Sequence, residues 1–113
     1  MKIHIITLFP DMFEPIFNAS MMWKAQQANA VTFELIDLRQ FGLGPRRQVD
    51  DTPYGGGDGM LLMVEPLITA IEHAKSTYHT SNKRVKVVLP SPRGTTYKQS
   101  DAKRLAALDE DLI

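Results

Sequence analysis

Residues 49–60 carry the densest group of chemically specific residues in the chain. The segment reads Val-Asp-Asp-Thr-Pro-Tyr-Gly-Gly-Gly-Asp-Gly-Met, so four glycines (Gly55, Gly56, Gly57 and Gly59) follow an acidic pair and a Pro-Tyr step. Glycine loses more conformational entropy on folding than other residues, and it is retained where the backbone takes positive φ or approaches another group closely. The segment lacks the serine and repeat character of a flexible linker. It therefore indicates a binding surface built from backbone.

Charged side chains within this segment and before it offer two kinds of chemistry. Asp50 and Asp51 could act as a general base and its neighbour, or accept hydrogen bonds from a base edge; the alternative is that they only cap a turn. Arg46 and Arg47, with Arg39 upstream, could clamp a phosphate. Lysine plus arginine and aspartate plus glutamate each number 13, so the net charge is zero. A polyanion would therefore have to be held by local clusters and not by bulk charge.

A second candidate segment, Leu-Pro-Ser-Pro-Arg-Gly at residues 89–94, directly follows an apolar run. Its prolines give a rigid shape that exposes backbone N–H and C=O groups. Such groups suit a flat heteroaromatic ring, which needs hydrogen bonds at its edge and close walls. The alternative is a plain strand-to-helix turn.

Several common sites are excluded. No lysine follows Gly59 as a phosphate-binding P-loop would require, and the glycines do not lie between the first strand and its helix as in a dinucleotide fingerprint. The chain has no cysteine, which excludes disulfides and cysteine-metal sites and fits a reducing cytoplasm. The three histidines, His4, His73 and His79, show no ligand spacing. We therefore expect structural or surface roles for them and no metal site.

Apolar periodicity predicts the elements that must position these segments. A buried strand is expected over residues 2–8, a helix over 11–17 capped by Asp11 and Glu14, and a second helix over about 21–28. A strand over 31–37 precedes a long irregular segment over 38–59. There follow a helix from 65 to about 78, a polar turn over 79–84, a buried strand over 85–89, a helix over about 97–108 capped by Thr95 or Thr96, and a strand beginning at 112.

This order of strands and helices predicts a single α/β domain with a layered parallel sheet. Ligands bind beyond the carboxyl ends of the strands in such sheets. Both candidate segments follow strands, so we expect them to converge at one rim. The apolar runs are too short to span a bilayer, which makes a membrane an unexpected partner.

Four motifs together resemble one known family. Residues 5–13 (Ile-Ile-Thr-Leu-Phe-Pro-Asp-Met-Phe), 49–60, 64–67 (Val-Glu-Pro-Leu) and 89–94 occur in the order and spacing of the bacterial TrmD-type tRNA (guanine-N1)-methyltransferases, members of the SPOUT class. The block at 49–60 is the most specific of the four. The resemblance covers essentially the whole chain.

The resemblance implies transfer of a methyl group from S-adenosylmethionine to N1 of the guanosine 3′-adjacent to the anticodon of tRNA. It also implies a trefoil-knot fold and a homodimer with active sites at the subunit interface, and tRNA, not DNA, as the partner. One wall of the methyl-donor pocket would be formed by Leu89, Pro90, Ser91, Pro92 and Gly94. Asp50 would contact the tRNA, and Gly55, Gly56, Gly57 and Gly59 would shape the loop near the donor and the target base. With tRNA as the substrate, Arg46 is the candidate clamp for one of its phosphates. Arg93 and Asp58 depart from the residues usual in the family.

The same resemblance implies that residues 1–113 are the N-terminal portion of the methyltransferase domain. The knot-closing half, the catalytic residues and the C-terminal tRNA-binding domain would lie beyond Ile113. Guanine N1 is protonated at neutral pH, so a general base must remove its proton, and that base would be in the missing half. We therefore expect the 113-residue chain alone to be inactive. The alternative function is a non-catalytic RNA- or partner-binding module.

Overall fold

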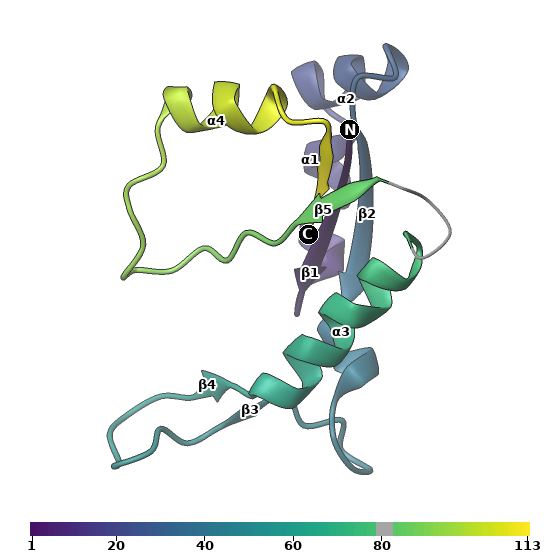
Figure 1. Ribbon diagram of the computed structural model, residues 1–113. Coiled ribbons are helices and arrows are strands. Elements are labelled where there is room, and N and C mark those ends of the chain that lie inside the picture. Colours follow the sequence, from purple (N-terminus) through teal and green to yellow (C-terminus); the bar gives the residue numbers. More distant parts are fainter. Residues whose placement is uncertain (79–82) are drawn as a thin grey trace.

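A four-stranded parallel sheet forms the centre of the protein (Figure 1). The structure is a computed structural model that describes residues 1–78 and 83–113. Residues 79–82, which include His79 and most of the expected polar turn, lie outside these ranges. The strands are β1 (Lys2–Thr7), β2 (Thr32–Asp37), β5 (Arg84–Lys86) and β6 (Glu110–Leu112), in the order β2-β1-β6-β5. The expected α/β fold with a parallel sheet is confirmed.

The strand register shows that segments far apart in sequence meet in the middle of the sheet. β1 and β2 pair along their whole length, from Lys2 opposite Thr32 to Thr7 opposite Asp37. β6 lies between β1 and β5, and it pairs through Leu112 with Ile3 on one side and with Lys86 on the other. The last strand of the chain therefore joins the first strand to β5.

Helices cover both faces of the sheet. α1 (Glu14–Phe17) and α2 (Ser20–Gln27) connect β1 to β2, α3 (Val64–Ser76) precedes β5, and α4 (Gln99–Ala106) connects β5 to β6. Side chains alternate along a strand, and β2 shows it: Phe33 stacks on Phe17 of α1 with centroids 4.1 Å apart, while Ile36 faces α3. The sheet is therefore the middle of three layers.

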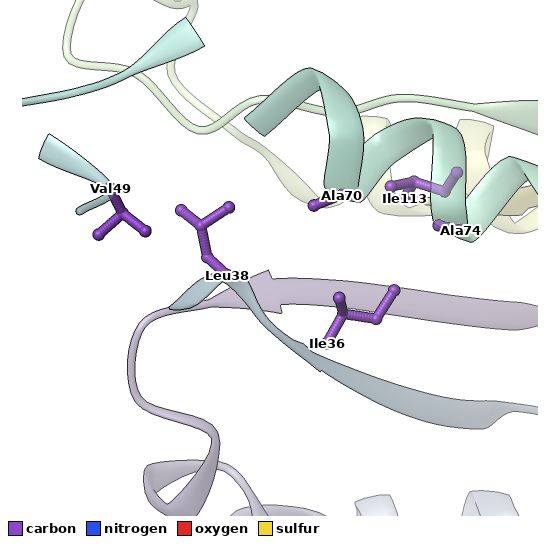
Figure 2. Packing of buried hydrophobic residues seen from close by; sticks show 6 residues of the cluster. All are labelled: Ile36, Leu38, Val49, Ala70, Ala74 and Ile113. Atoms are coloured by element: carbon purple, nitrogen blue, oxygen red, sulfur yellow. The ribbon is translucent and has the colours of Figure 1, made fainter. Parts of the chain in front are cut away.

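The core lies between the sheet and α3 (Figure 2). Its buried members are Ile36, Leu38, Val49, Ala70, Ala74 and Ile113. Ala70 and Ala74 are fully buried, and the small size of alanine lets α3 approach the sheet closely. On this helix Leu67, Ile71 and Ala74 pack inward, whereas Ile68 is half exposed. The face of α3 that carries Leu67, Ala70, Ile71 and Ala74 therefore packs on the sheet.

Two expected helix caps are wrong. The helix expected over 11–17 is split into a 3-10 helix, Pro10–Met12, and α1, and no side chain caps either one because Phe9 and Phe13 occupy the cap positions. Pro10 at the first helical position sets this start, since its fixed φ suits that place. Before α4 the cap residue is Lys98, not Thr95 or Thr96, and the Asp101 carboxylate accepts the Lys98 N–H at 3.0 Å.

The strand expected over 85–89 is shorter and less buried than predicted. β5 ends at Lys86, and Val87, Val88 and Leu89 are 44%, 44% and 70% exposed. β5 is an outer strand of the sheet, and its continuation pairs on one side with Ile113 while much of its apolar surface stays exposed. The apolar run at residues 85–89 forms a surface suited to burial, but much of this surface stays exposed among the described residues.

Candidate functional site

The glycine-rich segment lies at the tip of a hairpin that projects from the body of the protein (Figure 1). β3 (Asp50–Asp51) and β4 (Leu61–Leu62) pair antiparallel, Asp50 opposite Leu62. The Met63 N–H donates to the Val49 carbonyl at 2.8 Å and closes the base. We call residues 49–63 the glycine hairpin. The segment predicted to be irregular is thus an ordered hairpin, and two-residue strands are too short to produce a periodic signal in sequence.

The four glycines at the tip adopt backbone conformations that other residues rarely reach. The φ angles of Gly55, Gly56, Gly57 and Gly59 are 90°, 83°, 119° and 92°. A Cβ added at any of them would meet no atom within 4 Å, so conformation and not close packing requires glycine. This confirms the expected use of positive φ.

A turn before the hairpin gathers three arginines. The Asp37 carboxylate caps the 3-10 helix Leu38–Phe41 by accepting the Arg39 N–H at 2.9 Å. Leu43 and Gln48 then pair through two backbone hydrogen bonds of 2.8 and 2.9 Å. The turn between them is closed by the Arg47 N–H on the Gly44 carbonyl at 3.1 Å, with Arg47 at a φ of 50°. The main chain itself therefore fixes where the arginines lie.

These arginines and Asp50 line one shallow depression of about 350 Å³. Its full lining is Arg39, Arg46, Arg47, Gln48, Val49, Asp50 and Met60. The Gln48 side-chain amide donates to the Asp50 carbonyl at 2.9 Å and holds the start of β3. None of the three arginines has an acidic partner within 4 Å among the described residues. The depression is therefore positively charged and suited to an anion, while Asp50 supplies an acceptor at its edge.

The second candidate segment leaves the far side of the sheet as an exposed strap. The Val88 N–H donates to the Ile113 carbonyl at 2.8 Å, which anchors the segment beside β6. Beyond it, the Gly94 N–H donates to the Ser91 carbonyl at 2.9 Å, and the Arg93 N–H to the Ser91 hydroxyl at 3.2 Å. All six residues of 89–94 are exposed. These bonds form a tight turn that keeps Leu89 and the two prolines open to solvent.

The strap and the turn that carries the arginines both begin at the carboxyl ends of the parallel strands, along one edge of the sheet. They follow strands on opposite sides of the sheet. Because the sheet is parallel, β2 and β5 both end at this edge, the first leading through the 3-10 helix to the arginine turn and the second to the strap. They are the two outer strands, three inter-strand spacings apart, or roughly 14 Å. Both segments therefore follow strands that end at the same edge, but no described contact joins the glycine hairpin to the strap, so their convergence stays a prediction.

Periodicity did not indicate one feature, a polar cluster buried between β1, α3 and β6. His4, which is 1% exposed, shares a hydrogen bond of 2.7 Å with the Tyr78 hydroxyl, and that hydroxyl donates to Asp111 at 3.0 Å. Asp111 also accepts the Lys2 N–H at 2.6 Å and pairs with the Lys83 ammonium at 2.8 Å. These contacts tie both ends of the chain together. His4 therefore has the structural role that its lack of ligand spacing suggested.

Burial and pairing shift the pKa values in this cluster. Burial lowers the pKa of His4 below 6.5, against the opposing effect of Glu34. Burial and the Asp111 carboxylate raise the pKa of Tyr78 to about 12. Burial alone would raise the pKa of Asp111, but the bonds from Lys2, Lys83 and Tyr78 lower it overall. At neutral pH the cluster therefore holds His4 in its neutral form and Asp111 as a carboxylate.

Within residues 1–78 and 83–113, no group of three histidine, aspartate or glutamate side chains is arranged to hold a metal ion. No helix in the same ranges has the length and apolar character to cross a membrane.

Comparison with known proteins agrees with the fold and with the motifs. The family profile described as tRNA (Guanine-1)-methyltransferase TrmD matches residues 1–113. A tRNA (guanine-N(1)-)-methyltransferase of Clostridium botulinum is 44% identical over 113 residues, which are 100% of this chain and 44% of that protein. Its counterpart from Anoxybacillus flavithermus is 42% identical over 106 residues, 94% of this chain and 42% of that protein. The chain therefore spans less than half the length of these curated relatives.

A solved structure also matches the whole chain. The crystal structure of tRNA (m1G37) methyltransferase from Aquifex aeolicus superposes with a TM-score of 0.80 at 28% sequence identity. The match covers 100% of this chain and 49% of that one. The α/β fold, the four motifs and the family profile all agree, and the chain belongs to the tRNA (guanine-1)-methyltransferase family, TrmD.

Proposed function

We propose that this chain provides the N-terminal part of an enzyme that methylates N1 of the guanosine 3′-adjacent to the anticodon of tRNA. The observation that carries this proposal is the family match over residues 1–113, a range that includes both the glycine hairpin and the strap. Membership alone does not assign a reaction, because one fold supports many chemistries. The geometry of the two segments supports this one.

The strap is suited to form one wall of a site for S-adenosylmethionine, which supplies the methyl group when bound. Leu89 and the prolines offer apolar surface to a flat adenine ring, and the turn at Ser91–Gly94 fixes their arrangement. A wall without charge except at Arg93 fits a heteroaromatic ring better than it fits a phosphate. The residues that we assign to it are Leu89, Pro90, Ser91, Pro92 and Gly94.

The arginine depression and the hairpin are suited to hold the tRNA. Arg46 would contact a phosphate of the anticodon loop, since it lines a positive depression without an acidic partner among the described residues. Asp50, in the same lining, would accept from a base edge or orient the guanine. The bare backbone of Gly55, Gly56, Gly57 and Gly59 leaves room for that base.

Residues 1–113 alone would be inactive and would bind S-adenosylmethionine weakly. A donor held against a single exposed wall remains largely in solvent, whereas ligand sites in proteins bury most of the ligand surface. The rest of the pocket and the general base would come from a longer polypeptide and from its homodimer partner. The working location would be the cytoplasm, where tRNA is.

A chimera tests the proposal. Residues 1–113 would replace the segment that aligns with them in the Clostridium botulinum relative, which matches all 113 residues. The purified chimera would be assayed for transfer of a radiolabelled methyl group to unmodified tRNA, with the 113-residue chain assayed in parallel. We expect the chimera to methylate tRNA at guanine N1 and the isolated chain to show no turnover.

Two variants of the chimera connect activity to the site. Arg46→Gln should raise KM for tRNA with little change in kcat, because a phosphate contact acts on binding, and Asp50→Asn should lower kcat/KM. A folded chimera that transfers no methyl group would contradict the proposed function, and turnover by the isolated chain would contradict the proposed inactivity. A chimera that methylates another position of the tRNA would refute the assigned target.

A further inference from the structure

We propose that Tyr54 is a stacking platform for an unpaired RNA base, which would make it a positioning residue next to the arginine depression. The proposal rests on the function proposed above and adds a contact that neither the fold nor the family match assigns. It concerns the class of RNA that this end of the molecule can hold, namely single-stranded nucleotides of a loop.

Tyr54 presents its ring entirely to solvent. Its exposed fraction is 105%, the highest among the large hydrophobic side chains that the structure describes. Aromatic side chains usually bury 150–250 Å² and contribute much of the packing energy of cores and interfaces. A tyrosine with no packing partner contributes nothing of this kind to stability, so its position favours a role in binding.

The backbone places Tyr54 in a tight turn. The Gly56 N–H donates to the Pro53 carbonyl at 3.1 Å, and Gly55 has a φ of 90°. These are the features of a type II turn, with Pro53 and Gly56 at its ends and glycine at the position that requires positive φ. Tyr54 is therefore the outward residue of an ordered turn, not part of an irregular loop.

The residues that follow Tyr54 leave space beside it. Gly55, Gly56, Gly57 and Gly59 have no side chains, and a Cβ at each would still meet no atom within 4 Å. A planar base can therefore approach the tip without displacing protein atoms. Stacking is tolerant of sequence because every base has a π-face.

The arginine depression indicates an RNA strand as the ligand. Asp50 lines the depression and lies four residues from Tyr54, so the Cα atoms of the two residues are at most roughly 14 Å apart along an extended chain. Phosphates of a strand could occupy the depression while one of its bases lies on the ring. Proteins that bind single-stranded RNA combine a positive groove with aromatic rings in this way, whereas bases in a duplex are stacked on each other and not available.

The test is the affinity of the 113-residue chain for an unmodified anticodon stem-loop RNA, measured by fluorescence anisotropy over a series of salt concentrations. Tyr54→Leu should weaken binding roughly tenfold or more, and Tyr54→Phe, which keeps the ring, should bind within about twofold of the original chain. The slope of log affinity against log salt should not change in either variant, because neither alters a phosphate contact. Arg46→Gln should reduce that slope by about one.

Two controls make the result specific. Tyr97→Leu removes another exposed tyrosine, 66% exposed and far along the chain, and should leave the affinity unchanged. A fully paired RNA of the same length should bind equally well to the original chain and to Tyr54→Leu. Equal affinity of Tyr54→Leu and the original chain for the stem-loop would overturn the stacking role, and so would a loss for Tyr54→Phe as large as for Tyr54→Leu. No binding of the stem-loop by the original chain would overturn both this inference and the RNA site in the proposed function.

Discussion

His4 places an imidazole where water does not reach, and its chemistry depends on that position. Nε2 is bonded to Tyr78, while Nδ1 lies 3.4 Å from a Glu34 carboxylate oxygen without a hydrogen bond. The Lys2 ammonium occupies the same carboxylate at 2.9 Å and lowers the pKa of Glu34. A proton added to His4 would therefore be buried close to the positive charge of Lys2. Glu34 would balance it only in part, because the same carboxylate is already paired with Lys2.

Stability should consequently fall as the solution becomes acidic. The pKa of His4 is lowered in the folded state, so below pH 6.5 the unfolded chain takes up the proton more readily than the folded one. The free energy of unfolding should drop by at most about 1.4 kcal/mol per pH unit in this window. It should drop further near the ordinary values of Glu34 and Asp111, whose pKa values are lowered in the fold. Urea unfolding over a pH series measures this dependence.

Matched variants identify the groups. His4→Gln can still bond to Tyr78 but does not titrate, so it should remove the dependence that begins at pH 6.5 and leave the more acidic part. The pKa of Tyr78 is raised to about 12 from 10.0, so stability should also fall as pH rises above 10, and Tyr78→Phe should remove that loss. An unchanged acid profile in His4→Gln would show that another group is responsible.

The structural role of a single residue could be predicted where its own backbone conformation decides that role. It could not be predicted where partners distant in sequence decide it. The positive φ of Gly55–Gly57 follows from residue type, because glycine alone adopts it without strain. The burial of His4 depends on Tyr78 and Asp111, which are 74 and 107 positions away in sequence. No local pattern around His4 contains them.

Among the elements, the turn that carries the arginines depends on one glycine. Gly42 has a φ of −64°, which any residue could adopt, yet an added Cβ would overlap the backbone of Arg47. Gly42→Ala should therefore push the turn open and cost about 1–3 kcal/mol of stability. It should also weaken binding of the stem-loop RNA, because Arg39, Arg46 and Arg47 would no longer line one depression.

Gly44→Ala is the matched control for this turn. Gly44 has a φ of 65° but open space around it, so alanine meets only strain of about 1–2 kcal/mol. In both variants the stiffer unfolded chain offsets about 0.4–1 kcal/mol of the loss, so this effect cancels in their comparison. Urea unfolding should therefore rank Gly42→Ala below Gly44→Ala in stability. The reverse order would mean that close approach is not the reason for glycine at position 42.

Elements with long periodic patterns were predicted well, and elements built by pairing were not. β1, β2 and α3 appear within one or two residues of their expected bounds, because each has several apolar residues at a regular spacing. β3 and β4 have two residues each and exist because Asp50 and Asp51 pair with Leu62 and Leu61. The start of α4 depends on Asp101 reaching back to the Lys98 N–H. Such contacts are visible only once the chain is folded.

At the scale of the whole molecule, two groups of exposed apolar side chains among the described residues bear on association. Val87, Val88 and Leu89 continue the outer strand β5, and Ile16, Met21 and Met22 line an open depression of about 540 Å³ beside α1 and α2. Exposed apolar residues along a sheet edge favour pairing with another chain. The isolated chain should therefore self-associate as its concentration rises.

A charge at the sheet edge should reduce this association. Val88 is 44% exposed, and its N–H bond to Ile113 belongs to the backbone, so Val88→Lys should lower the mean mass in sedimentation velocity. The free energy of unfolding should change by no more than about 0.5 kcal/mol. Ile68→Lys places the same charge on the exposed side of α3, away from the edge of the sheet, and should leave the association intact. An equal effect of both variants would assign the reduction to net charge.

The position of β6 between β1 and β5 has a consequence for synthesis on the ribosome. β1 and β2 can pair early, but β5 has no neighbour until residues 110–112 emerge, 24 positions after Lys86. At about 5–20 residues per second this interval is roughly 1–5 seconds. During that time α3 packs on an incomplete sheet, and the apolar run at 85–89 is open to any chaperone near the tunnel exit.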